Sequence, residues 1–196
     1  MPRRLHWNLN RRFPAERRSR TYVFVGLLIS FLLGSAIGCY TGSSAGGSDI
    51  ASTDLLYYAS EPSGFFPVLL KLSRFHIAAM LAATSTIGLF AVFLISLLRG
   101  YVLTCTMAVI QSALPDHGMA AAWLICGISA VITIPSLFLL ELDAFTGSVH
   151  LRRKSIASDT AVDNQLLHGL ITAVSLFLAA WVEYAWIPAL VNRLLS

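Results

Sequence analysis

One carboxylate lies deep in the last apolar stretch of the chain, where its chemistry would matter most. Glu183 falls about 26 Å from the start of the helix expected over residues 166–191, at a rise of about 1.5 Å per residue. That distance places the side chain near one membrane interface. A carboxylate at such depth costs free energy in lipid and marks a candidate functional site. The alternative is that Glu183 reaches the water between the lipid headgroups.

Aromatic residues surround this carboxylate. Trp181, Tyr184 and Trp186 are typical of the belt that lines a membrane–water interface. The alternative is that their rings stack on a bound ligand.

Basic residues near other apolar runs supply the expected partners. Arg74, or else Lys71, is expected to pair with Glu183, because both lie beside the second apolar run at the same membrane face. A second pair is expected at the opposite face, between Arg99 and Glu141, which close the second and fourth spans.

Catalytic chemistry is not indicated. Gly127-Ile128-Ser129-Ala130 is faintly similar to the serine motif of intramembrane rhomboid proteases, with His168 as the conceivable base. The two residues are expected at different depths, whereas a base must come within about 3 Å of its nucleophile. The sequence has no HExxH motif and no phosphate-binding glycine loop. Its three cysteines are widely spaced, so neither a metal site nor a disulfide framework is implied. We therefore expect no enzyme and no cofactor.

Composition sets the environment of these residues. Charged residues make up 12% of the chain, hydrophobic residues 56%, and the mean hydropathy is +0.71. A soluble domain carries about 25% charged and 45–50% apolar residues, so the chain is expected to be an integral membrane protein. The net charge of +4 does not indicate nucleic-acid binding, because the basic residues flank apolar runs and anchor them in the bilayer.

The apolar runs predict an all-α, polytopic membrane protein of about five transmembrane helices. Residues 1–20 form a basic N-terminal segment, and residues 21–191 form a single membrane domain. The expected spans are residues 21–40, 76–98, 100–114, 119–140 and 166–191, and residues 41–64 form a Gly/Ser-rich outer linker. Because Lys71 and Arg74 share one face amid bulky apolar residues, Phe65–Phe75 is expected to be an interfacial amphipathic helix.

The positions of the basic residues predict the orientation. A cytoplasmic N-terminus and five spans place eleven basic residues inside, and only Lys71, Arg74 and Arg193 outside. The expected location is the cytoplasmic membrane, with the C-terminus extracytoplasmic. The span over 100–114 is short, and the alternative is that it does not cross fully.

Four short motifs, in this order, resemble the stage II sporulation protein M family over about residues 20–190. They are Phe31-Leu32-Leu33-Gly34-Ser35-Ala36-Ile37-Gly38, Arg99-Gly100-Tyr101, Asp116-His117-Gly118 and Glu183-Tyr184-Ala185-Trp186-Ile187-Pro188. The resemblance implies interaction roles for His117 and Glu183, and Pro188, which ends the last motif, is a further structural candidate. Departures are Ala120-Ala121-Ala122, where the family has a glutamate after the His-Gly, and Ile134-Pro135-Ser136-Leu137-Phe138 in place of a small-residue segment ending in glycine and arginine.

The resemblance implies a non-catalytic membrane scaffold that positions peptidoglycan hydrolases during engulfment in sporulation, with sporulation proteins D and P as its partners. The outer linker 41–64 is then a candidate docking surface. Two alternatives remain: a permease-like subunit using Glu183, and a membrane subunit that docks an ATPase through Arg152-Arg153-Lys154. Gly26, Gly34 and Gly38 allow close helix contact within the chain or, alternatively, in a homo-oligomer.

Overall fold

The structure is a computed structural model that describes residues 6–44, 64–85, 87–113, 117–153 and 159–195. Every secondary-structure element in these ranges is a helix. The helices are α1 (His6–Ser44), α3 (Phe65–Ala83), α4 (Gly88–Ala113), α5 (Gly118–Ala122), the π-helical turn η1 (Trp123–Gly127), α6 (Ile128–Arg153), α7 (Asp159–Ala185) and α8 (Ile187–Leu195).

Five apolar segments of the described chain are long enough to cross a membrane. They are Arg20–Ser44, Phe65–Ala83, Gly88–Ala113, Gly118–Val149 and Leu167–Leu190. Large apolar side chains such as Leu32, Phe90 and Leu178 remain exposed along them, as expected for surfaces that face lipid. The prediction of an all-α polytopic membrane protein is confirmed, but several boundaries differ from the predicted ones.

The helix predicted over residues 65–75 is not a separate element. These residues are the first half of α3, which continues to Ala83 and is itself long and apolar enough to span. Gly64 precedes the helix with φ of 150°, a conformation that glycine adopts readily. Pro67 stands in the first turn, where a missing N–H costs little. Lys71 and Arg74 therefore lie within a membrane span.

The predicted span 76–98 is interrupted by the turn between α3 and α4. The hydroxyl of Thr84 donates to the carbonyl of Leu81 at 2.8 Å, and the amide of Ile87 donates to the hydroxyl of Ser85 at 3.2 Å. Such local side-chain bonds compete with helix continuation. Gly88 then starts α4 against the carbonyl of Ala82, where an added Cβ would overlap that oxygen.

The predicted helix boundary at Arg99-Gly100 is also wrong, because both residues lie in the middle of α4. Gly100 is required by the close approach of α1: an added Cβ would overlap the backbone oxygen of Phe31. Gly34 of α1 packs in the same way on the backbone oxygen of Leu97. These glycines serve a close helix contact inside one chain.

The fourth span is longer than predicted and has a defect near its start. Residues 118–149 form a segment of 32 residues, in which α5 passes through η1 into α6. Gly127 ends η1 beneath the ring of Trp123, 2.6 Å from an added Cβ. Single π-helical turns of this kind often occur at functional sites.

The fifth span breaks at its end. Helix α7 stops at Ala185 and α8 starts at Ile187. Pro188 explains the break, because it has no N–H to donate to the carbonyl one turn earlier.

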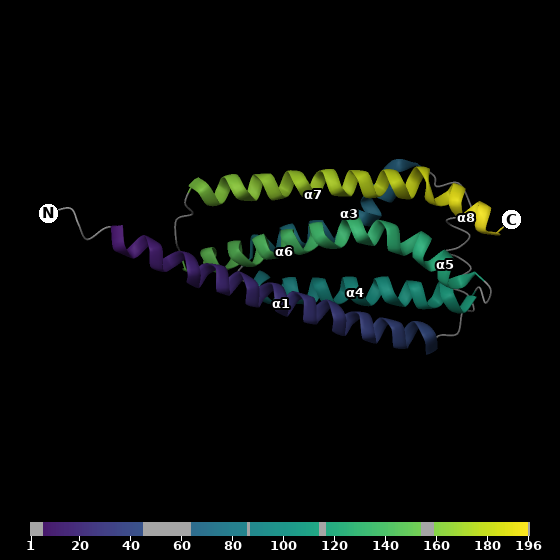
Figure 1. Cartoon of the computed structure of the whole chain (residues 1–196), viewed down its shortest axis with the longest axis horizontal. Coiled ribbons are helices and arrows are strands. Elements are labelled where there is room, and N and C mark those ends of the chain that lie inside the picture. Colours follow the sequence, from purple (N-terminus) through teal and green to yellow (C-terminus); the bar gives the residue numbers. More distant parts are fainter. Residues whose placement is uncertain (1–5, 45–63, 86, 114–116, 154–158, 196) are drawn as a thin grey trace.

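Figure 1 shows the long helices running alternately up and down the length of the molecule. One end, here called the α5 end, carries α5, α8 and the start of α3. The opposite end, here called the Thr84 end, carries the α3–α4 turn, the end of α6 and the start of α7 (Figure 1). Helix α3 packs on α4, α6 and α7, and α1 lies mainly on α4. Apolar clusters around Ile125, Val92 and Ala179 hold these contacts together.

Candidate functional site

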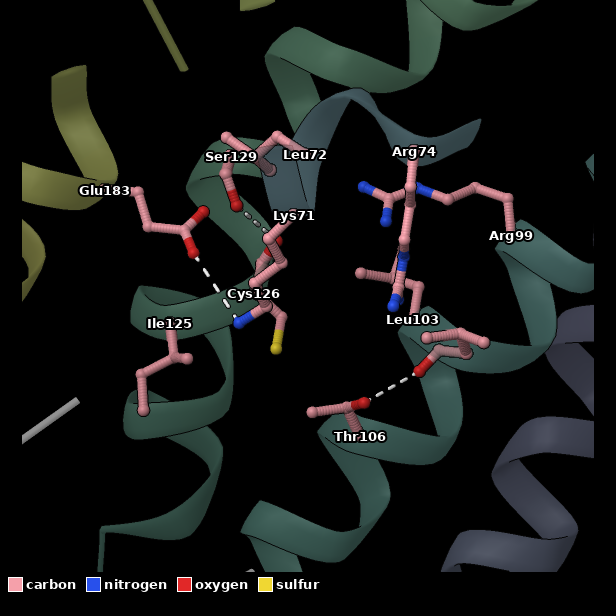
Figure 2. Close-up of a pocket in the computed structure, with 11 residues that line it drawn as sticks. Lys71, Leu72, Arg74, Arg99, Leu103, Thr106, Ile125, Cys126, Ser129 and Glu183 are labelled. Carbon is pink, nitrogen blue, oxygen red and sulfur yellow. Dashed lines mark hydrogen bonds and ion pairs between the residues drawn. The ribbon is translucent and has the colours of Figure 1, made fainter. Parts of the chain in front are cut away.

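A partly open cavity of about 260 Å³ lies between α3, α4, η1, α6 and α7. Its lining combines charged, hydroxyl and apolar side chains. The lining residues are Lys71, Leu72, Arg74, Arg99, Val102, Leu103, Thr106, Ile125, Cys126, Ser129 and Glu183. Figure 2 shows Glu183 and Lys71 on one side of the cavity and the two arginine side chains on the other.

Glu183 forms an ion pair with Lys71. The Nζ–Oε1 distance is 3.8 Å, and the side chain of Glu183 is 3% exposed whereas that of Lys71 is 40% exposed. Helix α7 contributes the carboxylate and α3 the ammonium group, so the pair joins two spans across the cavity wall. The two partners predicted for Glu183 were Arg74 or Lys71, and the structure brings Lys71 to it.

Both arginines of the cavity face the ring of Phe75. The guanidinium carbon of Arg74 lies 4.9 Å from the ring centroid, and that of Arg99 lies 5.3 Å from it. Arg99 also donates to the hydroxyl of Thr133 on α6 at 3.2 Å. The distance between the two guanidinium carbons is therefore at most the sum of these two distances, although the two arginines come from different helices.

The basic side chains of the cavity originate well inside the membrane spans. At the rise of an α-helix, Lys71 lies about 9 Å and Arg74 about 14 Å from the start of α3, and Arg99 lies about 20 Å from the end of α4. From the sequence these residues were expected at the membrane faces, because the turns were predicted at other positions. Ionisable residues at this depth are rare and usually functional.

His76 extends the polar region beyond the cavity and was missed as a site residue. It is 3% exposed, and its Nε2 lies 3.1 Å from the hydroxyl oxygen of Ser136. Its position two residues after Arg74, at the start of the predicted span 76–98, is the signal that could have drawn attention to it.

The predicted pair between Arg99 and Glu141 is not formed. Arg99 binds Thr133, which precedes Glu141 by about 12 Å of α6 at the helical rise. Glu141 is fully buried beside Ser96 of α4. Neither of its carboxylate oxygens has a hydrogen-bond partner among the described residues.

The conceivable serine–histidine pair is not formed either. Ser129 donates to the carbonyl of Cys126 at 3.5 Å, whereas His168 contacts Asp143 with 2.6 Å between Nδ1 and Oδ2. Asp143 lies about 21 Å farther along α6 than Ser129. His168 therefore belongs to the Thr84 end, and Ser129 to the cavity.

The remaining predicted site residues lie near the α5 end. His117 is exposed at the start of α5 and makes no side-chain capping bond. Pro188 is in α8, whose Ile187 packs with Ile110 and Ala121.

Some predicted features fall outside what the structure describes. They are Asp116, residues 45–63 of the outer linker, Lys154, and the side chains of the basic segment before residue 20 and of Arg152 and Arg153.

The cavity is suited to binding an anion. Among the described residues that line it, three carry a positive charge and one a negative charge. Guanidinium groups bind carboxylate, phosphate or sulfate oxygens in a planar, two-pronged geometry. No group of three metal-ligating side chains occurs in the described part of the chain. Comparisons with models of protein families, with curated proteins and with solved structures found no match to the chain.

Proposed function

We propose that the protein is a permease-like membrane protein that binds a small anionic solute in the cavity between α3, α4, η1, α6 and α7. The observation that carries this proposal is the excess of positive charge in an intramembrane cavity. Its lining contains three basic residues, Lys71, Arg74 and Arg99, and one acidic residue, Glu183. Cations are costly at this depth in lipid. A bound anion would lower that cost, since charges interact more strongly there than in water.

The size of the cavity limits the solute. Sites for drug-sized ligands have volumes of about 300–1,000 Å³, so a cavity of about 260 Å³ suits a smaller anion. Lys71 is 40% exposed, so we take its ion pair with Glu183 as the point of entry. An entering anion would compete with the Glu183 carboxylate for Lys71.

We further propose that the membrane is the cytoplasmic membrane, with the N-terminus in the cytoplasm. Seven basic residues lie before or at the start of the first span and three lie in Arg152-Arg153-Lys154, and five spans put both groups at one face. Arg193, beyond the last span, is the basic residue of the opposite face. The positive-inside rule favours this orientation. The cavity then extends from the outer end of the bundle to its middle.

The test is anion binding by the purified protein in lipid nanodiscs. Titration with sulfate, and separately with succinate, is expected to give saturable binding that weakens as ionic strength rises. Arg74→Gln and Arg99→Gln should each weaken binding at least tenfold, about the 1.5–3 kcal/mol of a hydrogen bond to a charged group. Arg193→Gln, which removes a basic residue outside the cavity, should leave binding unchanged. Equal binding by all four proteins would overturn the proposal.

The scaffold role implied by the resemblance stays a prediction, as does the docking of an ATPase through Arg152-Arg153-Lys154. Affinity capture of the tagged protein in mild detergent separates these classes from the permease. Recovery of peptidoglycan hydrolases, together with no anion binding, would favour the scaffold. Recovery of an ATPase together with anion binding would favour a transport subunit.

A further inference from the structure

The open side of the cavity is lined by α3. The lining residues that η1, α6 and α7 contribute are buried or half-buried. The exposed residues of the lining are Lys71 and Arg74, both from α3. At the helical rise they lie about 9 Å and 14 Å from the start of that helix. The cavity therefore opens beside α3, inside a membrane span.

One face of α4 is packed near both ends of the helix and more loosely in its middle. Val92 and Ile110 are buried on this face. Arg99, Leu103 and Thr106 lie on the same face between them, at intervals of three, four or seven residues, and are only half-buried. All three line the cavity. The cavity thus interrupts the packing of α4, and buried residues lie on both sides of it along the helix.

Toward the α5 end, an apolar cluster bounds the cavity. Ile110 of α4, Ala121 of α5, Ile125 of η1 and Ile187 of α8 pack together there, each at most 1% exposed. Ile125 also belongs to the cavity lining. We therefore take the side between α3 and α4, where the exposed lining residues lie, as the opening.

The rim of this opening on α3 is part of the lipid-facing surface. Arg74 shares a face of the helix with Leu70, Ile77 and Leu81, which lie four residues before it and three and seven residues after it. These three apolar side chains are 51%, 47% and 66% exposed, as expected for contact with lipid. A guanidinium group thus originates from the lipid-facing side of a span, where a charge is costly.

The rim on α4 is continuous with lipid-facing surface as well. Val102 of the lining follows Leu98 and Leu94 at intervals of four residues. Leu94 and Leu98 are exposed, and Val102 is half-buried at the cavity. The apolar surface of α4 therefore leads along this line of residues directly to the cavity wall.

Ring contacts hold the two arginines at the opening. An arginine on the lipid-facing side of a helix commonly extends toward the membrane surface. Arg74 instead lies over the ring of Phe75, 4.9 Å from its centroid, and Arg99 lies over the same ring. Figure 2 shows the two arginine side chains approaching each other from α3 and α4. Because Lys71 is paired with Glu183, the arginines supply the excess positive charge of the cavity.

We propose that the anion bound in the cavity is the phosphate headgroup of a lipid, which enters sideways from the bilayer between α3 and α4. This inference rests on the proposed function, because it assigns the solute of the same site. Arg74 and Arg99 bind the phosphate oxygens, a contact that guanidinium groups make in a two-pronged geometry. The acyl chains stay outside, against the lipid-facing rim. A cavity smaller than sites for drug-sized ligands then needs to hold only the headgroup.

The experiment uses phosphatidic acid that carries a photoreactive diazirine in its acyl chains, at a low mole fraction in phosphatidylcholine nanodiscs that contain the full chain. After illumination, mass spectrometry of peptides locates the attached lipid. Label should concentrate on the rim of the opening, at Leu70, Ile77 and Leu98. Excess unlabelled phosphatidic acid should reduce this label at least tenfold, whereas an equal addition of phosphatidylcholine should leave it unchanged.

Lipid-facing residues away from the cavity give the internal control. Leu32 of α1 and Leu178 of α7 are 56% and 51% exposed. Label on these residues reports contact with bulk lipid. Unlabelled phosphatidic acid should lower it no further than dilution of the labelled lipid requires.

Variants of the cavity test the role of its charge. Arg74→Gln and Arg99→Gln should each lower the displaceable label at the rim at least tenfold. Arg193→Gln, which removes a basic residue outside the cavity, should leave it unchanged. Equal label in all four proteins would overturn the proposal. A rim that takes no more label than Leu32, whether it is closed or covered by a second copy of the chain, would overturn it as well.

Sodium sulfate separates the lipid headgroup from a solute that arrives from water. Sulfate should displace the label at the rim more than sodium chloride of the same ionic strength, because sulfate and the headgroup use the same arginines. Sulfate binding without displaceable label at the rim leaves the proposed function standing and removes the lipid headgroup. Displaceable label without sulfate or succinate binding removes the free solute and leaves the lipid site.

Discussion

The ion pair between Lys71 and Glu183 joins a buried carboxylate to a half-exposed ammonium group, 3.8 Å apart. Removing Lys71 leaves the buried carboxylate of Glu183 without this counter-ion, so the loss includes the cost of an unsatisfied buried charge. Removing Glu183 leaves an ammonium group that is 40% exposed, so the loss is mainly that of the interaction itself.

Glu183→Gln and Lys71→Met should each lower the free energy of unfolding in detergent by about 1–3 kcal/mol. The reciprocal exchange, Lys71→Glu with Glu183→Lys, should recover part of that loss because the pair is rebuilt with its charges reversed. Thermal unfolding followed by circular dichroism measures all three proteins.

The matched control is the exchange of Arg74 with Glu183, which should not recover stability, because Arg74 faces Phe75 rather than Glu183. If that exchange restores stability and the exchange with Lys71 does not, the pairing described here is wrong.

At the scale of elements, the contact between α1 and α4 depends on glycine. An added Cβ at Gly34 would overlap the backbone oxygen of Leu97, which no rotation of a side chain can relieve. Gly169 in α7 offers the matched control, since an added Cβ there meets no atom within 4 Å.

Gly34→Ala should lower the free energy of unfolding by about 1–3 kcal/mol, because the two backbones must move apart. Gly169→Ala should instead raise it by about 0.5–1 kcal/mol, as alanine is the better helix former. Both are measured as thermal unfolding in one detergent. Equal effects of the two substitutions would mean that α1 does not pack closely on α4.

The beginning of α4 illustrates why element boundaries were hard to predict. Membrane spans are recognised by apolarity, and the hydroxyl residues Thr84 and Ser85 are tolerated inside such spans. Arg99-Gly100 was a stronger signal for the end of a helix than Thr84 and Ser85, although Gly100 is in fact needed for the close contact with α1. A charged residue followed by glycine marks a turn or a close contact equally well, and only the neighbouring helix distinguishes the two.

At the scale of the whole molecule, the turn at Thr84 changes which residues reach water. Thr84 lies at the end of the bundle opposite α5, and Ser112 lies near the α5 end; both side chains are exposed. Leu98 is exposed as well but lies in the middle of the span Gly88–Ala113, where it faces lipid.

Single cysteines in a cysteine-free background test this arrangement with a membrane-impermeant maleimide. Ser112→Cys should react in intact cells. Thr84→Cys should react only in inverted vesicles, and Leu98→Cys in neither. These outcomes follow from water access, because the thiolate forms only where water can solvate it.

Labelling of Leu98→Cys from the cytoplasmic side, with no labelling of Thr84→Cys, would mean that the turn lies at Arg99-Gly100 and not at Thr84. Labelling of Ser112→Cys only in inverted vesicles would reverse the proposed orientation.

The amino-acid sequence by itself determined the class of the protein and its number of spans. Apolarity and the rarity of charge decide insertion into lipid one segment at a time, so five spanning helices could be predicted without knowing their contacts. For the same reason Glu183 was recognisable as a candidate, and Lys71 as one of its two possible partners.

Only the tertiary structure decided which charged groups meet. Three contacts depend on the rotation and depth of each helix. They are the ion pair of Glu183 with Lys71, the position of Arg99 in the cavity lining, and the contact of His76 with Ser136. The rotation and depth are set by the turn at Thr84 and by backbone contacts at Gly34 and Gly100. A shift of one turn along a helix moves a side chain by about 5.4 Å, more than the length of an ion pair.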